Sequence, residues 1–282
     1  MTIRTSGLTR RYGAVTALDG VDVEFSAGAV HGLLGRSGAG KTTLLRILAG
    51  QEFPDGGTVS GVPAAVCLVR EDQPFPDTYR VGHALRAAAL LQPRWSAAVA
   101  DEALARFGLP PDRRVRSLSR GERSMLGAVI GLASRADLTL LDEPYLGLDA
   151  VARRAFSDLL LADYAEHPRT IVLCSHLIDE AADLLEHVVV LDRGRVVLDD
   201  DVDALRGRAV TVSGPAASVE RFVAGCGELH RAQLGSTLRV TALGAPPTAP
   251  PDLEVAPVSL QELVVRTSTL DRPSGAHPEE PR

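Results

Sequence analysis

The chain has 282 residues, of which 45% are hydrophobic and 23% charged, and its formal net charge is −6 at pH 7. This length accommodates one large or two modest domains, and the composition is that of a globular protein with a buried core. The acidic balance argues against a general nucleic-acid-binding protein, and no apolar run approaches the ~20 residues of a membrane-spanning helix.

The three cysteines, Cys67, Cys174 and Cys226, are widely spaced and form no C-x-x-C pair. An odd number of such cysteines argues against a disulfide framework or a zinc site. The first residues also lack the apolar core of a signal peptide. Cys67 and Cys174 lie in apolar runs, so we expect them to be reduced core residues of a cytosolic chain. Any membrane-spanning part of its function then belongs to another chain.

Residues 2–28 alternate in the manner of β-strands, with a turn at 11–13. Tyr12 lies in this short polar turn. Its ring is as consistent with stacking on a flat purine base as with packing on the edge of a sheet, and the local sequence leaves both interpretations open.

The segment 35–43 matches G-x-x-x-x-G-K-[ST], the phosphate-binding loop of P-loop NTPases. A buried strand at 30–34 and a helix at 43–48 supply the context that this motif requires. Glycines allow tight turns, and converging N–H groups and the helix dipole favour a phosphate. Lys41 is expected to reach the β- and γ-phosphates, and the Thr42 hydroxyl to bind Mg²⁺. The predicted nucleotide-binding residues here are Gly35, Arg36, Ser37, Gly38, Ala39, Gly40, Lys41, Thr42 and Thr43.

After this helix the pattern predicts two strands and then a helical insert. The strands are expected at 58–61 and 64–69, and a polar loop at 70–74 follows the second. Apolar residues then recur at helical spacing over 81–107, and Pro93 is expected to divide this stretch into separate helices.

Ser119 and Glu122 have the S-x-x-E spacing of a capping box and open a helix that runs to about residue 133. By itself this spacing indicates only how the helix begins. A buried strand then ends in Asp142 and Glu143. Downstream of a P-loop, Asp142 is expected to hold Mg²⁺, and Glu143 to act as the general base for an attacking water.

A strand at 170–174 places His176 at its carboxyl end, where ligands bind in open α/β sheets. The ordinary alternative is a histidine that only begins the next helix. An acidic helix is expected from 177 to about 187. A hairpin is expected at 188–197, with Arg193 and Gly194 in its turn.

The composition changes from about residue 208, and short strand and helix patterns predict a small α+β appendage. Residues 244–251 form a Pro-rich connection, and the polar, Pro-rich carboxyl end is expected to be disordered. The expected domains are an ATP-binding domain at 1–205 with its helical insert at about 82–134, the appendage at 206–268, and the tail at 269–282.

Together these motifs resemble the nucleotide-binding subunit of an ABC (ATP-binding cassette) transporter, over roughly residues 3–205. The resemblance implies an α/β P-loop core with an N-terminal antiparallel β subdomain. It implies ATP hydrolysis with Mg²⁺, coupled to transport through a separate membrane-spanning subunit at the inner face of the membrane. The appendage resembles those of bacterial ABC-2-type exporters, so export is expected.

The resemblance also implies a second ATP-binding subunit, either another copy or a paralogue, and no nucleic-acid partner. Tyr12 matches the aromatic residue that stacks on adenine, and His176 matches the histidine that contacts the γ-phosphate. Ser119 and Gly121 match phosphate-contacting positions of the family signature, and 146–149 resembles the D-loop.

Three residues depart from the family pattern. Arg120 replaces the first signature glycine, and Glu122 replaces a glutamine. Glu122 is expected to place a negative charge near an incoming γ-phosphate, and Arg120 to offset it. Glu71 falls at the position of the family's Q-loop glutamine, with Gln73 two residues later, and its carboxylate is expected to approach Mg²⁺.

Two rival functions are consistent with these motifs. The first is a soluble ABC ATPase that acts on ribosomes or DNA, although this chain has one cassette and no sustained heptads. The second is a nucleotide-dependent regulatory subunit that does not hydrolyse ATP. Glu143 and His176 disfavour it, whereas the altered signature and the altered Q-loop position keep it open.

Overall fold

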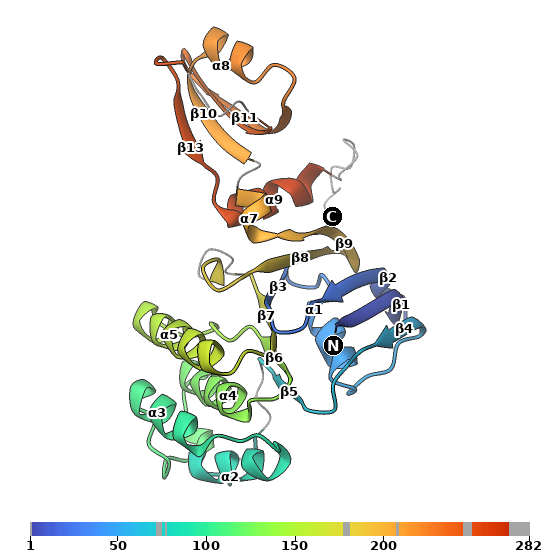
Figure 1. Ribbon diagram of the computed structural model, residues 1–282, viewed down its shortest axis with the longest axis vertical. Coiled ribbons are helices and arrows are strands. Elements are labelled where there is room, and N and C mark those ends of the chain that lie inside the picture. The colour runs from blue at the N-terminus through green and yellow to red at the C-terminus, as the bar shows by residue number, and fades with distance from the viewer. Residues whose placement is uncertain are drawn as a thin grey trace, which may run out of the picture. The chain divides into compact units, whose positions relative to one another are not determined.

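The structure, a computed structural model, describes residues 2–71, 75–76, 78–176, 181–206, 209–244 and 250–270, with side chains through residue 265 in the last stretch. By its internal contacts the chain divides into two compact units, Met1–Asp199 and Asp200–Arg282 (Figure 1). None of the helices in these described stretches is long and apolar enough to cross a lipid bilayer.

The first unit is built on a six-stranded sheet whose central strands are parallel. In sheet order its strands are β5 (Val66–Val69), β6 (Leu138–Asp142), β7 (Thr170–Ser175), β3 (Val30–Leu34), β8 (His187–Asp192) and β9 (Arg195–Asp201). Every residue of β3, β6 and β7 is buried. This continuous burial is characteristic of parallel strands that are covered on both faces.

The register of these strands brings three distant segments to one edge of the sheet. Leu34 pairs with Ser175, and Asp142 pairs with Cys174. The carboxyl ends of β3, β6 and β7 therefore lie side by side. The loop after β3, the acidic pair at the end of β6 and the histidine after β7 all start from this edge.

One face of the sheet is covered by helix α1 (Lys41–Leu48) and by a three-stranded antiparallel sheet. The order of that smaller sheet is β2 (Val15–Phe25), β1 (Ile3–Tyr12) and β4 (Gly56–Ser60). Phe25, Leu44 and Leu140 belong to one buried cluster, which joins β2, α1 and β6. The predicted α/β P-loop core with an antiparallel β subdomain is confirmed.

The opposite face carries helices. Leu141 follows Leu140 in β6 and so points to the other side, where Gly131 of α4 approaches it. A Cβ on Gly131 would lie 2.9 Å from side-chain atoms of both Leu141 and Val69. The helices of this layer are α2 (Val81–Leu91), α3 (Ala97–Phe107), the 3₁₀ turn η1 (Val115–Ser117), α4 (Arg120–Ser134) and α5 (Ala150–Glu166). Figure 1 shows α2 to α5 gathered on one side of the sheet.

The helical insert divides as the sequence predicts. Helix α2 ends at Leu91, two residues before Pro93, and Ser96 accepts a hydrogen bond from the Val99 N–H to begin α3. The hairpin prediction is also confirmed, because Arg193 and Gly194 have φ values of 48° and 78° between β8 and β9. Two consecutive positive φ values suit a two-residue hairpin turn.

The expected helix from 177 to about 187 is wrong at its carboxyl end. Residues 177–180 lie outside the described chain, residues 182–184 form a turn, and His187 begins β8. Leu184 and Leu185 are buried, and the Glu186 N–H donates to the Val30 carbonyl at 2.9 Å. These contacts hold the chain against β3 and end any helix before the strand.

The second unit is an α+β structure with an antiparallel four-stranded sheet. In sheet order the strands are β11 (Gly227–Leu234), β12 (Thr237–Leu243), β10 (Ala209–Pro215) and β13 (Glu254–Pro257), and the helices are α7 (Val202–Arg206), α8 (Ala216–Phe222) and α9 (Leu260–Leu270). Val212, Val219 and Val240 are buried between the sheet and α8. The sequence missed β11 and β13 because β11 buries only Leu229 and β13 is four residues long.

A buried ion-pair network fastens the helical layer to the sheet. Asp163 of α5 accepts hydrogen bonds from Arg135, just after α4, at 2.7 and 2.9 Å. Its other carboxylate oxygen lies 2.8 Å from a guanidinium nitrogen of Arg169, which directly precedes β7. Asp163 and Arg169 are only 7% and 6% exposed. Removing one partner of such a group leaves an uncompensated buried charge.

We predict that Asp163→Ala lowers the free energy of unfolding by about 3–5 kcal/mol, because Arg169 then has no buried carboxylate. Urea unfolding followed by the fluorescence of Trp95, the one tryptophan of the chain, measures this. Asp158→Ala is the matched control on α5, since its pair with Arg154 is exposed and is worth about 0–1 kcal/mol. Equal effects of the two variants would contradict the prediction.

Candidate functional site

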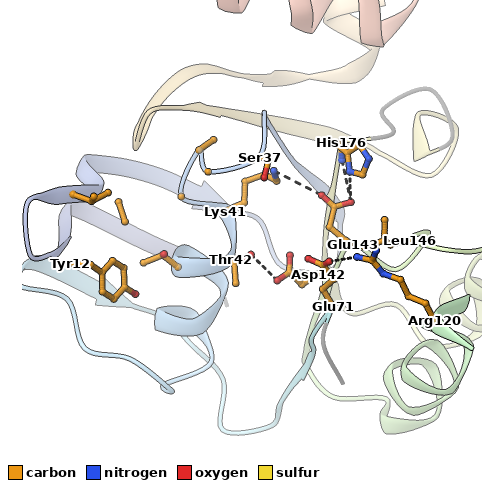
Figure 2. Close-up of a pocket in the computed structure, with 16 residues that line it drawn as sticks. Tyr12, Ser37, Lys41, Thr42, Glu71, Arg120, Asp142, Glu143, Leu146 and His176 are labelled. Atoms are coloured by element: carbon orange, nitrogen blue, oxygen red, sulfur yellow. Dashed lines mark hydrogen bonds and ion pairs between the residues drawn. The ribbon is translucent and has the colours of Figure 1, made fainter. Parts of the chain in front are cut away.

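A pocket of about 510 Å³ lies at the edge of the six-stranded sheet where β3, β6 and β7 end (Figure 2). Its volume is in the range of about 300–1,000 Å³ that is usual for small-molecule sites. Its lining consists of Tyr12, Val15, Ala17, Ser37, Gly38, Ala39, Gly40, Lys41, Thr42, Thr43, Glu71, Arg120, Asp142, Glu143, Leu146 and His176.

The glycine-rich loop is pressed against neighbouring strands, which accounts for two of its glycines. Gly35 has a φ of 143°, and a Cβ there would lie 2.2 Å from the Leu191 carbonyl oxygen. Gly40 has a φ of 104°, and a Cβ there would lie 2.3 Å from the Ala17 carbonyl oxygen. Only glycine fits such backbone conformations and approaches. The loop is thus held from behind by β2 and β8, and its other side faces the pocket.

Lys41 begins α1 directly after this loop, and its side chain is 7% exposed. Its Nζ donates hydrogen bonds to the carbonyls of Gly35 at 2.7 Å and Arg36 at 3.1 Å. The same nitrogen lies 4.0 Å from a carboxylate oxygen of Glu143. The ammonium group therefore stands between the loop and the acidic end of β6, in reach of an anion that enters the loop.

Thr42 and Asp142 fit a magnesium ion. The Thr42 hydroxyl donates to Oδ2 of Asp142 at 2.9 Å, and Asp142 is 4% exposed. Its other oxygen, Oδ1, is buried without a hydrogen-bond partner within the described part of the chain. A buried carboxylate oxygen without a partner is costly, and hydroxyl and carboxylate oxygens are the ligands that Mg²⁺ prefers.

The residue paired with Asp142 across β6 and β7 is a neutral thiol. Burial, followed by the nearby Asp142 carboxylate, raises the pKa of Cys174 well above its ordinary value. Cys174 therefore adds no charge of its own beside Asp142.

The position of the Glu143 carboxylate is set by the backbone conformation of this residue and by its contacts with His176. Its φ of 51° is uncommon for a residue with a side chain, and its N–H donates to the Cys174 carbonyl at 2.9 Å. The carboxylate lies 2.8 Å from Nδ1 of His176 and accepts a longer hydrogen bond, 3.4 Å, from the His176 N–H (Figure 2). Strained backbone of this kind is concentrated at functional sites. The geometry aims one carboxylate into the pocket beside Lys41.

Tyr12 lines the far end of the pocket. Tyr12 is 42% exposed, and Val15, its partner across the β1–β2 turn, is 65% exposed. The Tyr12 hydroxyl donates to Glu52, and the Arg10 guanidinium carbon lies 4.9 Å from the ring centroid. The ring is thus anchored at both its hydroxyl and one side, and its exposure to the pocket favours the stacking interpretation.

The structure separates the predicted nucleotide-binding residues into two groups. Residues 37–43 line the pocket, whereas Gly35 and Arg36 do not line it and contribute carbonyls to Lys41. Ser119 and Gly121 do not line this pocket. A Cβ on Gly121 would lie 2.2 Å from the carbonyl oxygen of Gly147, so this glycine permits the close approach of α4 to the 146–149 segment.

The capping box predicted for Ser119 and Glu122 is confirmed, and it changes the interpretation of Glu122. The Glu122 carboxylate accepts the Ser119 N–H at 2.8 Å, while the Ser119 hydroxyl accepts the Glu122 N–H at 3.2 Å. The hydrogen bond from the Ser119 backbone lowers the pKa of Glu122, and Arg113 pairs with the same carboxylate. The charge that we expected Arg120 to offset is therefore offset by Arg113.

Arg120 instead donates to Oε1 of Glu71 at 2.6 Å. Glu71 lines the pocket, but its approach to Mg²⁺ stays a prediction, and Gln73 lies outside the described residues.

Sequence reasoning missed Val15, Ala17, Arg120 and Leu146 as lining residues. Val15 directly follows the turn after Tyr12, and Arg120 and Leu146 belong to segments that resemble family motifs, so these positions carried a signal. Ala17 carried none.

Comparisons with known proteins agree with this geometry. A family model described as "ABC transporter" matches residues 18–146. The chain is 34% identical over 206 residues to the aliphatic sulfonates import ATP-binding protein SsuB 1 of Nocardia farcinica, covering 73% of this chain and 84% of that protein. It is 36% identical over 224 residues to SsuB 3 of Rhodococcus jostii, covering 74% and 82%.

Solved structures show the same fold. An ATP-binding subunit of an ABC transporter superposes with a TM-score of 0.65 at 23% identity, covering 73% of this chain and 92% of that chain. A dimeric bacterial ABC transporter cassette, MJ0796, superposes with a TM-score of 0.64 at 20% identity, covering 71% and 98%.

We predict that Tyr12→Ala weakens ATP binding about tenfold, because a base stacked on an aromatic ring is worth ~1–3 kcal/mol. Tyr12→Phe is the matched control, since it keeps the ring and removes only the hydroxyl that contacts Glu52. Equilibrium titration with ATP and with inorganic tripolyphosphate separates the base from the phosphates. Equal weakening for both ligands would contradict stacking.

Proposed function

The chain belongs to the ABC transporter family as an ATP-binding subunit, and we propose that the pocket of its first unit is where it binds and hydrolyses ATP. Subunits of this family use ATP hydrolysis to power transport through a membrane subunit, and this chain is such an ATPase. One observation carries the assignment to this pocket: Lys41, the Thr42–Asp142 pair and Glu143 converge in it from three different segments.

In this proposed site the triphosphate binds to the glycine-rich loop. Backbone N–H groups of residues 37–43 and the start of α1 favour an anion there. Lys41 moves its hydrogen bonds from the loop carbonyls to the phosphate oxygens. Thr42 and Asp142 hold Mg²⁺, which supplies positive charge to the phosphates when it is bound. Tyr12 and Val15 take the base at the other end of the pocket.

Hydrolysis is assigned to Glu143. The oxygen of a water attacks the γ-phosphorus, its proton passes to the Glu143 carboxylate, and the bond to the bridging oxygen breaks to release ADP. His176 keeps that carboxylate in place through the 2.8 Å contact at Nδ1. Most of the rate enhancement then comes from positioning and charge, as is usual in phosphoryl transfer.

The two signature residues are assigned to a second ATP-binding subunit. Ser119 is exposed at the start of α4, and neither Ser119 nor Gly121 lines the pocket of its own chain. We propose that they face the nucleotide of a second copy or of a paralogue. We further propose that the complex lies at the inner face of the membrane, where a membrane-spanning subunit holds both ATPase chains.

The direction of transport that we propose is import. The expected exporter resemblance is not confirmed, because the curated relatives reported above are named as import ATP-binding proteins. Small aliphatic sulfonates are the first candidate substrates, since those relatives are named for them. The substrate is expected to contact the membrane subunit and its partners. The support for import is therefore the sequence similarity of this chain to the sulfonate import ATP-binding proteins.

We predict that Glu143→Gln lowers the rate of phosphate release about 10²–10⁴-fold, the usual contribution of a general base. Binding of Mg-ATP is retained, because Lys41, Thr42 and Asp142 are unchanged. The assay uses the chain purified with its membrane subunit. Glu166→Gln, an exposed residue at the end of α5, is the matched control. Full turnover by Glu143→Gln would contradict the role of this carboxylate, and an inactive wild type would support a regulatory subunit.

We further predict that tagged chain, isolated in mild detergent from its native cells, retains a multi-span membrane protein. Mass spectrometry with and without Mg-ATP identifies this partner and any second ATPase chain. Recovery of ribosomal or DNA-repair proteins with no membrane protein would contradict transport and support the soluble ATPase.

A further inference from the structure

Arg120 is a cation of the pocket that has no role in the proposed binding and hydrolysis of ATP. Arg120, the first residue of α4, lines the pocket together with Lys41 and Glu143. Figure 2 shows its side chain running from α4 toward the carboxylate of Glu71. Its Nη2 donates to Oε1 of Glu71 at 2.6 Å. The pair joins the helical layer to the segment that follows β5.

Folding stability does not explain this arginine. The two side chains are 67% and 45% exposed, and an ion pair that is open to water contributes little to stability. A positive charge in the first turn of a helix is also unfavourable, because the N-terminal end of the helix dipole is positive. The capping of α4 comes from Ser119 and Glu122, with Arg113 as the partner of Glu122. Arg120 is therefore best explained by the pocket that it lines.

The charges around Arg120 favour a phosphate ligand. Among the described lining residues the carboxylates are Glu71, Asp142 and Glu143, and the permanent cations are Lys41 and Arg120. Lys41 is shared between the loop and Glu143, and Asp142 faces Thr42. A terminal phosphate carries more charge and more acceptor oxygens than one carboxylate. It therefore competes well for a guanidinium, whose planar fork suits both ligands.

We propose that Arg120 is a further γ-phosphate-binding residue for the ATP bound in its own chain, and that Glu71 holds this arginine until ATP displaces the carboxylate. The inference rests on the proposed function of the pocket. Because ADP lacks the γ-phosphate, Arg120 then discriminates between ATP and ADP. Binding of ATP also frees Glu71, so the segment after β5 responds to which nucleotide is bound.

The test compares the affinity of the full chain for β,γ-imido-ATP, which resists hydrolysis, and for ADP, both with Mg²⁺. Titrations are made at concentrations where sedimentation shows a monomer. Arg120→Gln is expected to weaken binding of the triphosphate about tenfold or more, as for a lost hydrogen bond to a charged group, and to leave ADP binding within about twofold. Arg120→Lys is expected to restore only part of the loss, because an ammonium group lacks the planar fork.

Two further variants test whether Glu71 holds Arg120 before ATP binds. Glu71→Gln is expected to tighten triphosphate binding up to about fivefold, the upper range for an exposed pair. In the double variant with Arg120→Gln this gain disappears, which a double-mutant cycle measures. Arg116→Gln is the matched control, since Arg116 is exposed in the adjoining η1 turn and does not line the pocket. Thermal unfolding shows whether each variant is folded.

The outcomes separate this inference from the proposed function. A wild-type chain that binds neither nucleotide overturns the proposed function of the pocket. A wild type that binds both, with an unchanged affinity ratio in folded Arg120→Gln, overturns only the role of Arg120. An effect of Arg120→Gln that appears solely when two chains associate assigns the arginine to the other subunit's nucleotide and overturns the assignment to its own chain.

Discussion

The parallel register of β3, β6 and β7 is the constraint on which the site depends. It pairs Leu34 with Ser175 and Asp142 with Cys174, so three strands that lie far apart in the chain end at the same edge. Their residues are buried throughout, because α1 and the antiparallel sheet cover one face and helices cover the other. A shift of one residue in this register would turn the buried side chains to the wrong faces. The phosphate loop and the acidic pair would then no longer face one pocket.

The pocket concentrates groups that are unfavourable on their own. Oδ1 of Asp142 is buried without a hydrogen-bond partner within the described chain, and Glu143 has a positive φ. Lys41 is almost fully buried. The surrounding sheet stabilises this arrangement, and the proposed Mg-ATP ligand would supply the missing charges. Such preorganisation suits a reaction in which positioning and electrostatics account for most of the catalysis.

In the signature segment, the two residues that depart from the family motif interact with different partners in the structure. Glu122 is engaged by the N-terminal end of its own helix and by Arg113, so its charge is already compensated. Arg120 extends away from Glu122 toward Glu71 and the pocket. Two substitutions that look complementary in the sequence therefore act on different parts of the molecule.

The sequence by itself determined the elements whose chemistry is local. The phosphate loop, the capping box at Ser119 and the turn at Arg193–Gly194 each depend on residues within a few positions of one another, and all three are present as predicted. Tertiary structure alone decided the partner of Arg120, the end of the segment before His187 and the exposed strand β11. These depend on contacts between residues far apart in the chain, or on a strand with almost no buried face. Neither kind of feature leaves a periodic pattern in the sequence.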